Sequence, residues 1–184
     1  YTWQGHGASR EEFTGKYNTI YEALSEKFEN IEYVPGVEYD LMGTNWKFDQ
    51  NTGIRDAVRA ARRADVIIAC IGENTYCETP GNDVDMNLSA NQKELVKQLA
   101  ATGRPIILIL NGGRPRIIND IEPMATAVVD ILLPGNFGGD ALAALLSGEE
   151  NFSGRLPFTY PKYVNKFAVY DYMPSESQGI MSGS

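Results

Sequence analysis

One segment of the sequence, IGENTYCETPG at residues 71–81, combines residue types that can perform acid–base chemistry. Its two glutamates, Glu73 and Glu78, are five residues apart with Tyr76 between them, and two aspartates follow shortly after. Carboxylates that crowd together raise one another's pKa, and a glutamate raised to roughly 6 can act as a general acid near neutral pH. The segment is therefore a candidate for acid–base catalysis, while the same composition also fits a solvated loop.

The residues after this segment match a calcium-binding loop only in part. Positions 1, 3, 5 and 12 of such a loop are filled by Asp83, Asp85, Asn87 and Glu94. Position 6 requires glycine for a sharp turn, and Leu88 stands there instead. We therefore expect neither a metal site nor a cofactor.

Two other kinds of site have weaker signals. NGGRP at residues 111–115 places two glycines and an arginine before a predicted helix, an arrangement that can bind phosphate. It lacks the Gly-x-x-x-x-Gly-Lys-Ser/Thr pattern of nucleotide-binding loops, so a phosphate-responsive module stays a rival hypothesis. A Ser–His–Asp triad lacks its parts, because His6 is the single histidine and no serine stands in a Gly-x-Ser-x-Gly segment.

Length and composition limit the classes of protein. The 184 residues suffice for one sizeable core, so we expect a single domain over residues 1–184. The net charge of −8 argues against a nucleic-acid or anionic-membrane partner. The longest apolar runs, VIIACI and PIILIL, are far shorter than the roughly 20 residues that cross a bilayer. Two cysteines make neither a disulfide framework nor a zinc site.

Helix and strand patterns alternate along the chain. Apolar residues recur every three or four positions in segments that predict helices: residues 13–28, a helix from about residue 52, one from Ser89 to Gly103 with a capping-box spacing of Ser89 and Gln92, a short one near Pro115, and residues 140–148. Apolar runs predict strands at residues 31–36, 65–72, 105–111 and 126–135. This alternation predicts an α/β fold, a mostly parallel sheet with helices on both faces in a three-layer α/β/α sandwich. After residue 149 the pattern loses its period, and an extended chain lying against the domain is expected.

Ligands of such sheets bind at the carboxyl ends of the strands. In this chain those ends lead into residues 72–88, 111–114 and 134–138. The first of these loops, at about 17 residues, is much longer than the usual 2–6 and predicts a function. Glu73 follows the strand directly and is better placed to hold the loop, while Glu78 can reach outward.

Five stretches resemble, in family order, the second domain of glycoside hydrolase family 3, which includes β-glucosidases, β-xylosidases and β-glucan exohydrolases. They are YTWQG (1–5), IGENTYCETPGN (71–82), NGGRP (111–115), LLPGNFGGDALAALLSG (132–148) and NFSGRLPFTYP (151–161). The resemblance implies an α/β sandwich that follows a barrel domain, with the active site between them. It also implies retaining hydrolysis, in which one carboxylate attacks the anomeric carbon and a second protonates the leaving oxygen and then activates water.

The resemblance assigns the second carboxylate to this domain and the nucleophile to the barrel, to which nothing here corresponds. In the exohydrolase-like branch the pattern Gly-Glu-x-x-Tyr-x-Glu-Thr matches GENTYCET, which makes Glu78 the expected general acid/base. In another branch a Ser-Gly-Glu-Gly segment would favour Glu73, but that serine and second glycine are missing here. Trp3 maps to an aromatic clamp on the sugar, and Tyr76 and Glu73 are expected to contact substrate.

The resemblance also sets expectations for the whole protein. Its substrate would be a β-glucoside or a β-glucan oligosaccharide, its partner the barrel of the same polypeptide, and its location periplasmic or secreted. Family members continue before YTWQG and beyond the equivalent of Tyr172, so the chain is expected to be a fragment that is inactive alone. A non-catalytic carbohydrate-binding or degenerate module is the alternative.

Overall fold

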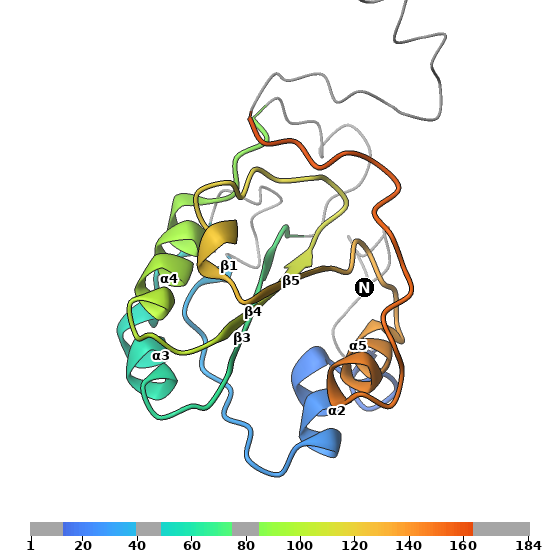
Figure 1. Ribbon diagram of the computed structural model, residues 1–184. Helices are drawn as coiled ribbons and strands as arrows, with labels where there is room; N and C mark the ends of the chain where they lie inside the picture. Colours follow the sequence, from blue (N-terminus) through green and yellow to red (C-terminus); the bar gives the residue numbers. More distant parts are fainter. Residues whose placement is uncertain (1–12, 40–48, 75–84, 164–184) are drawn as a thin grey trace, which may run out of the picture.

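The computed structural model describes residues 13–39, 49–74 and 85–163, and a parallel β-sheet lies at its centre (Figure 1). The sheet has the strand order β3 (Ile67–Gly72), β4 (Ile106–Asn111) and β5 (Ala127–Asp130). Gly72 lies opposite Asn111, and Leu110 lies opposite Asp130. The three strands therefore end at one common edge, and the loops after them start side by side.

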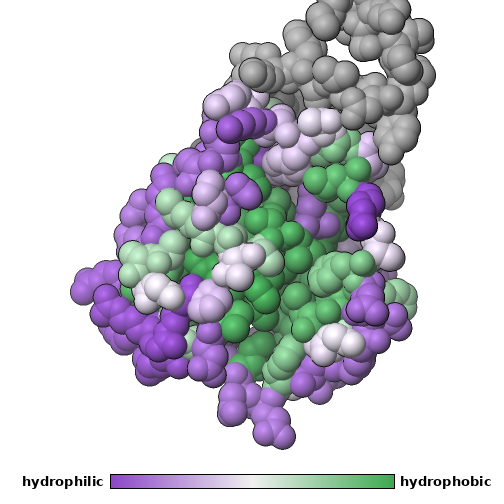
Figure 2. All heavy atoms as spheres, viewed as in Figure 1, coloured by the Kyte–Doolittle hydropathy of each residue, from purple (hydrophilic) through white to green (hydrophobic). Residues whose placement is uncertain are grey.

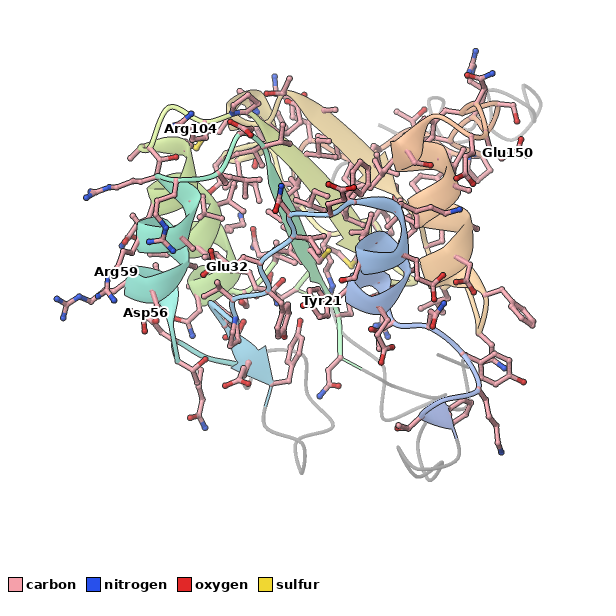
Figure 3. All side chains as sticks on the ribbon, turned by 90° about the horizontal axis from the view of Figure 1, so that it is seen from below. Tyr21, Glu32, Asp56, Arg59, Arg104 and Glu150 are labelled. Atoms are coloured by element: carbon pink, nitrogen blue, oxygen red, sulfur yellow. The ribbon has the colours of Figure 1, made fainter. Side chains whose placement is uncertain are left out.

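Helices cover both faces of this sheet, which confirms the predicted α/β fold. On one face lie α3 (Ile54–Ala61) and α4 (Ala90–Ala100), and on the other lie α2 (Ile20–Lys27) and α5 (Gly138–Ser147) (Figure 1). Apolar residues gather over the sheet between the helical layers, whereas hydrophilic residues line the outer helices (Figure 2). Asp56 and Arg59 on α3, for example, point away from the sheet (Figure 3).

The larger core cluster lies between the sheet and the pair α3 and α4. Its fully buried members include Ile106, Leu108 and Val96, and Ile54 at the start of α3 joins them. A smaller cluster between α2 and α5 contains Ala23, Leu24 and Ala143 and packs against Ile68 of β3. Alternate residues of β3 thus pack into different layers, as expected for a strand covered on both sides. No helix among the described residues reaches the length and hydrophobicity needed to traverse a lipid bilayer.

The helix predicted over residues 13–28 was too long at its N-terminal end. Gly15 adopts a left-handed conformation with φ of +76°, and α2 begins only after Thr19. The Thr19 hydroxyl accepts from the Glu22 backbone N–H at 3.2 Å, and the Glu22 carboxylate accepts from the Thr19 N–H at 2.7 Å. This capping box fixes the start of the helix inside the apolar pattern.

The strand predicted at residues 31–36 was wrong. This segment is irregular, and the nearest strands are the short antiparallel pair β1 (Glu38–Tyr39) and β2 (Asp49–Gln50). Pro35 has no backbone N–H for a ladder, and the Gly36 carbonyl instead accepts from Gly53 N–H at 3.1 Å. The segment is therefore held at the start of α3 rather than in a sheet.

Two predictions after β4 also needed correction. No helix forms near Pro115, because Ile117 donates from its backbone to the Met86 carbonyl at 2.7 Å and pairs with Asn87 in an isolated parallel bridge. A short 3₁₀ helix, η2 (Glu122–Met124), follows later. The last strand ends at Asp130 rather than at residue 135, since the Asp130 carboxylate accepts from Leu132 N–H at 3.0 Å in a turn.

Candidate functional site

A buried ionic cluster lies at the carboxyl ends of β3 and β4. The Glu73 carboxylate, whose side chain is 1% exposed, lies 3.1 Å from Arg114 Nη1 and 2.6 Å from Arg116 Nη2. Arg116 Nε also donates to Glu73 Oε1 at 2.7 Å, and the Arg114 backbone N–H donates to Oε2 at 3.1 Å. Both carboxylate oxygens therefore have donors, which a buried carboxylate requires.

The positions of the backbone around this cluster explain why Glu73 can lie so deep. The Glu73 N–H donates to the Asn111 carbonyl at 2.9 Å, which continues the β3–β4 pairing one residue beyond the strand. Gly112 then passes directly against the carboxylate, since a Cβ built there would lie 2.8 Å from Glu73 Oε2 and 3.0 Å from its Cγ. Gly112 of NGGRP therefore makes room for the buried carboxylate of Glu73.

Arg116 also contacts the far end of the long loop. Its Nη1 donates to the Asp85 carbonyl at 2.6 Å. The Asp85 carboxylate accepts from the Asn87 backbone at 3.0 Å and from its side-chain amide at 2.8 Å, which fixes the turn leading to α4. One guanidinium thus joins Glu73, at the start of the loop, to Asp85, near its end.

A second polar network holds the end of β3. The Gln92 side chain, buried on α4, accepts from Gly72 N–H at 2.8 Å and donates to the Gly72 carbonyl at 3.1 Å. Tyr39 donates its hydroxyl to the same carbonyl, and Ser89 donates to the Asp49 carboxylate. Ser89 also accepts from Gln92 N–H at 3.1 Å, but the Gln92 side chain serves Gly72 and does not complete the predicted capping box.

Gly72 itself has a conformation and surroundings that other residues would not tolerate. Its φ is +156°, and a Cβ there would lie 1.8 Å from the Asn111 carbonyl oxygen. At the end of β3, the backbone conformation of residue 72 therefore requires glycine, and Arg114 and Arg116 pair with the glutamate at residue 73.

The irregular chain after α5 returns to this site. It has no helix or strand over residues 151–163 and runs along the molecule towards the carboxyl edge of the sheet, as expected (Figure 1). There the Tyr160 hydroxyl donates to the Arg116 carbonyl at 2.7 Å. Burial raises the pKa of Tyr160, and the negative charges of Asp130 and Glu73 raise it further, so the hydroxyl stays protonated and remains a donor.

The described residues contain only part of the predicted site. Glu73 lies at the carboxyl edge, as its position after the strand predicted, and is paired with two arginines. Trp3, Tyr76 and Glu78 lie outside the described residues, so their roles stay predictions. Within the described ranges, no group of three or more histidine, cysteine or acidic side chains is arranged to hold a metal.

The sequence analysis did not select Arg116. It stands before the apolar pair Ile117 and Ile118, where a helical reading assigns it to a solvated face. The sequence did hold one indication of such a residue. A glutamate predicted at the end of a strand covered on both faces needs a nearby cation.

Comparisons with known proteins agree on one family. A model of the glycosyl hydrolase family 3 C-terminal domain matches residues 2–181. A lysosomal beta glucosidase of Dictyostelium discoideum is 39% identical over 152 residues, covering 82% of this chain and 18% of that protein. A periplasmic beta-glucosidase of Salmonella typhimurium is 35% identical over 118 residues, covering 64% of this chain and 15% of that protein.

Solved structures show the same likeness. A family 3 β-glucosidase of Bifidobacterium adolescentis matches with a TM-score of 0.71 and 26% identity over 82% of this chain and 22% of its own. A β-glucosidase of Listeria innocua, solved with isofagomine, matches with a TM-score of 0.66 and 26% identity over 78% of this chain and 19% of its own. The chain thus spans about a fifth of the proteins that it matches.

Proposed function

Because the chain belongs to the family of glycosyl hydrolase family 3 C-terminal domains, we propose that it is the second domain of a retaining β-glycosidase of the β-glucosidase type. The substrate would be a β-glucoside or β-glucan oligosaccharide, cleaved at terminal β-linked glucosyl residues. Several relatives bear the name β-glucosidase, and one matching structure was solved in complex with glucose. A barrel domain of the same polypeptide would supply the nucleophile.

The burial of Glu73 is the observation that carries the choice between the two glutamates. A general acid must bring its carboxyl group within hydrogen-bonding distance of the leaving oxygen. Glu73 has both oxygens engaged by arginine donors and a side chain that is 1% exposed. This arrangement favours Glu73 as support for the base of the loop, rather than as the acid or a direct sugar contact, and supports Glu78 as the general acid/base.

The proposed mechanism has two steps. While the barrel carboxylate attacks the anomeric carbon, Glu78 donates its proton to the glycosidic oxygen and the aglycone leaves. Glu78, now ionised, takes a proton from water as that water attacks the glycosyl-enzyme and releases the sugar. Trp3 would stack on the sugar on the aglycone side, with Tyr76 as a further contact. A periplasmic or secreted location is proposed from the periplasmic and lysosomal relatives.

Hydrolysis of aryl β-glucosides by variants of the full-length enzyme tests this proposal. In Glu78→Ala, substrates with a poor leaving group should lose roughly 10²–10⁴-fold in rate, while those with a good leaving group lose much less. Added azide should restore turnover of the activated substrate, because a small nucleophile needs no general base.

Glu73→Ala is the comparison variant. If the leaving-group dependence and azide rescue occur in Glu73→Ala and not in Glu78→Ala, the two assignments must be exchanged. If neither variant shows them, the domain supplies no acid/base, and a non-catalytic carbohydrate-binding module becomes the better account.

A further inference from the structure

We propose that Arg116 is a positioning residue for the acid/base step, because its guanidinium joins the two ends of the loop that carries Glu78. This inference rests on the proposed function. It concerns three described residues, Glu73, Asp85 and Arg116, and assigns to their contacts the task of fixing where the loop starts and ends.

The Arg116 guanidinium contacts both ends of the loop. Nε and Nη2 face Glu73 Oε1 at 2.7 and 2.6 Å, while Nη1 donates to the Asp85 carbonyl at 2.6 Å. The Arg116 side chain is 3% exposed. Because a guanidinium presents its donors in a rigid plane, the position of Glu73 and the position of Asp85 depend on each other. A lysine has one ammonium group and cannot hold both partners in this way.

The backbone of Arg116 is fixed as well. Its carbonyl accepts from the Tyr160 hydroxyl at 2.7 Å, and the next residue, Ile117, bonds the Met86 carbonyl at 2.7 Å. The returning chain and the end of the loop therefore bond the backbone at two consecutive residues, Arg116 and Ile117. These bonds fix the backbone position from which the Arg116 guanidinium reaches Glu73 and Asp85.

The contacts of Arg116 with Glu73 and Asp85, here called the joint, would affect catalysis through the distance between the general acid and the leaving oxygen. A general acid works only within about 3 Å of the oxygen that it protonates, and a misplacement of about 1 Å can lower a rate about 10²-fold. A loop whose ends are held close can keep its side chains in a narrower range of positions than one whose ends move independently. Loss of the joint should therefore impair the steps that need the acid/base and spare the others.

The pairing does not by itself explain the stability of the domain. A buried ion pair replaced by apolar residues of similar size is often neutral or stabilising, because both desolvation costs disappear. Two apolar side chains at positions 73 and 116 would therefore be expected to keep the domain at least as stable. Such a pair would leave the Asp85 carbonyl without the Nη1 donor that it now has.

The test is a series of aryl β-glucosides with leaving groups of decreasing acidity, hydrolysed by variants of the full-length enzyme. The variants are Arg116→Lys and the double variant Glu73→Leu with Arg116→Met, which removes both buried charges together. We expect kcat/KM to fall about 10²-fold for the poorest leaving group and only a few-fold for the best. Azide should accelerate turnover of the activated substrate, as in Glu78→Ala.

Lys93→Met is the control variant. Lys93 of α4 forms an ion pair with Asp120 at 2.9 Å, with side chains that are 15% and 36% exposed, and its loss should leave the dependence on the leaving group unchanged. A uniform fall in rate across the series in both Arg116 variants, as in any loosened domain, would overturn the inference. An unchanged profile would overturn it as well.

Parallel measurements on Glu78→Ala separate this inference from the proposed function. If Glu78→Ala shows the acid/base signature and the Arg116 variants do not, only the positioning role is lost. If the Arg116 variants show it and Glu78→Ala does not, Arg116 still positions the loop, and the assignment of Glu78 fails. If none of them shows it, both proposals fall.

Discussion

Arg116 Nη2 lies 2.6 Å from Glu73 Oε1, and the two side chains are 3% and 1% exposed. Two opposite charges are therefore buried together at the edge of the sheet. Removing Glu73 leaves the Arg116 guanidinium without its carboxylate in a poorly solvated place, whereas removing Arg116 leaves Glu73 with Arg114 as its only paired cation among the described residues. The cost of that is larger than the net stabilisation from the pair itself. The same pair is also where the end of β3 meets the end of the loop, through the bond from Arg116 to the Asp85 carbonyl.

Glu73→Leu should lower the free energy of unfolding by about 3–5 kcal/mol, because Arg116 then stays buried without its carboxylate. Urea unfolding followed by circular dichroism measures this loss. Adding Arg116→Met should recover much of it, since both charges are then absent. Additive losses in the double variant would show that the two side chains do not act as a pair.

Gly112→Ala should destabilise the protein by about 1–3 kcal/mol, because the new methyl group would lie 2.8 Å from Glu73 Oε2 and the buried carboxylate would have to shift away from its arginine donors. Gly154→Ala is the matched control, since no heavy atom lies within 4 Å of the Cβ position there. Thermal unfolding of the two variants compares the costs. Equal midpoints would mean that Glu73 does not pack against Gly112 as described.

The sheet and its covering helices could be predicted from the sequence because their signals are local. The unbroken apolar runs at residues 65–72 and 105–111 correspond to β3 and β4, and the helix patterns from residue 52 and Ser89 correspond to α3 and α4. The strand edge then followed from topology, and with it the place of Glu73. These predictions needed only periodicity and the rule that parallel strands share a carboxyl edge.

Errors arose where tertiary contacts replaced local preferences. Gln92 has capping-box spacing from Ser89, yet its amide bonds both backbone groups of Gly72, on a different element. The segment around Arg116 has helical spacing, yet its backbone bonds the chain at Met86. Neither partner is near in sequence, so no local pattern could have predicted the contact.

Gln92→Ala should cost about 1–3 kcal/mol of stability, because it leaves Gly72 N–H without its buried acceptor and removes a donor from the Gly72 carbonyl. The control is Gln98→Ala on the same helix, where the side chain bonds Glu94 at an exposed position and its loss should cost under about 0.5 kcal/mol. Thermal unfolding compares them. Indistinguishable midpoints would contradict the role given to Gln92.

Asp130 at the end of β5 should make stability depend on pH in the opposite sense from an ion-paired carboxylate. Burial raises its pKa, against the bond from Leu132 N–H that lowers it. Because the folded pKa is above the unfolded one, the ionised group destabilises the fold at neutral pH, and this cost disappears as the pH falls through the folded pKa. Asp130→Asn keeps an acceptor for Leu132 and should raise the unfolding midpoint at pH 7, with a gain that shrinks towards pH 4. A gain that grows in acid would show that the carboxylate is stabilised by a partner rather than destabilised by burial.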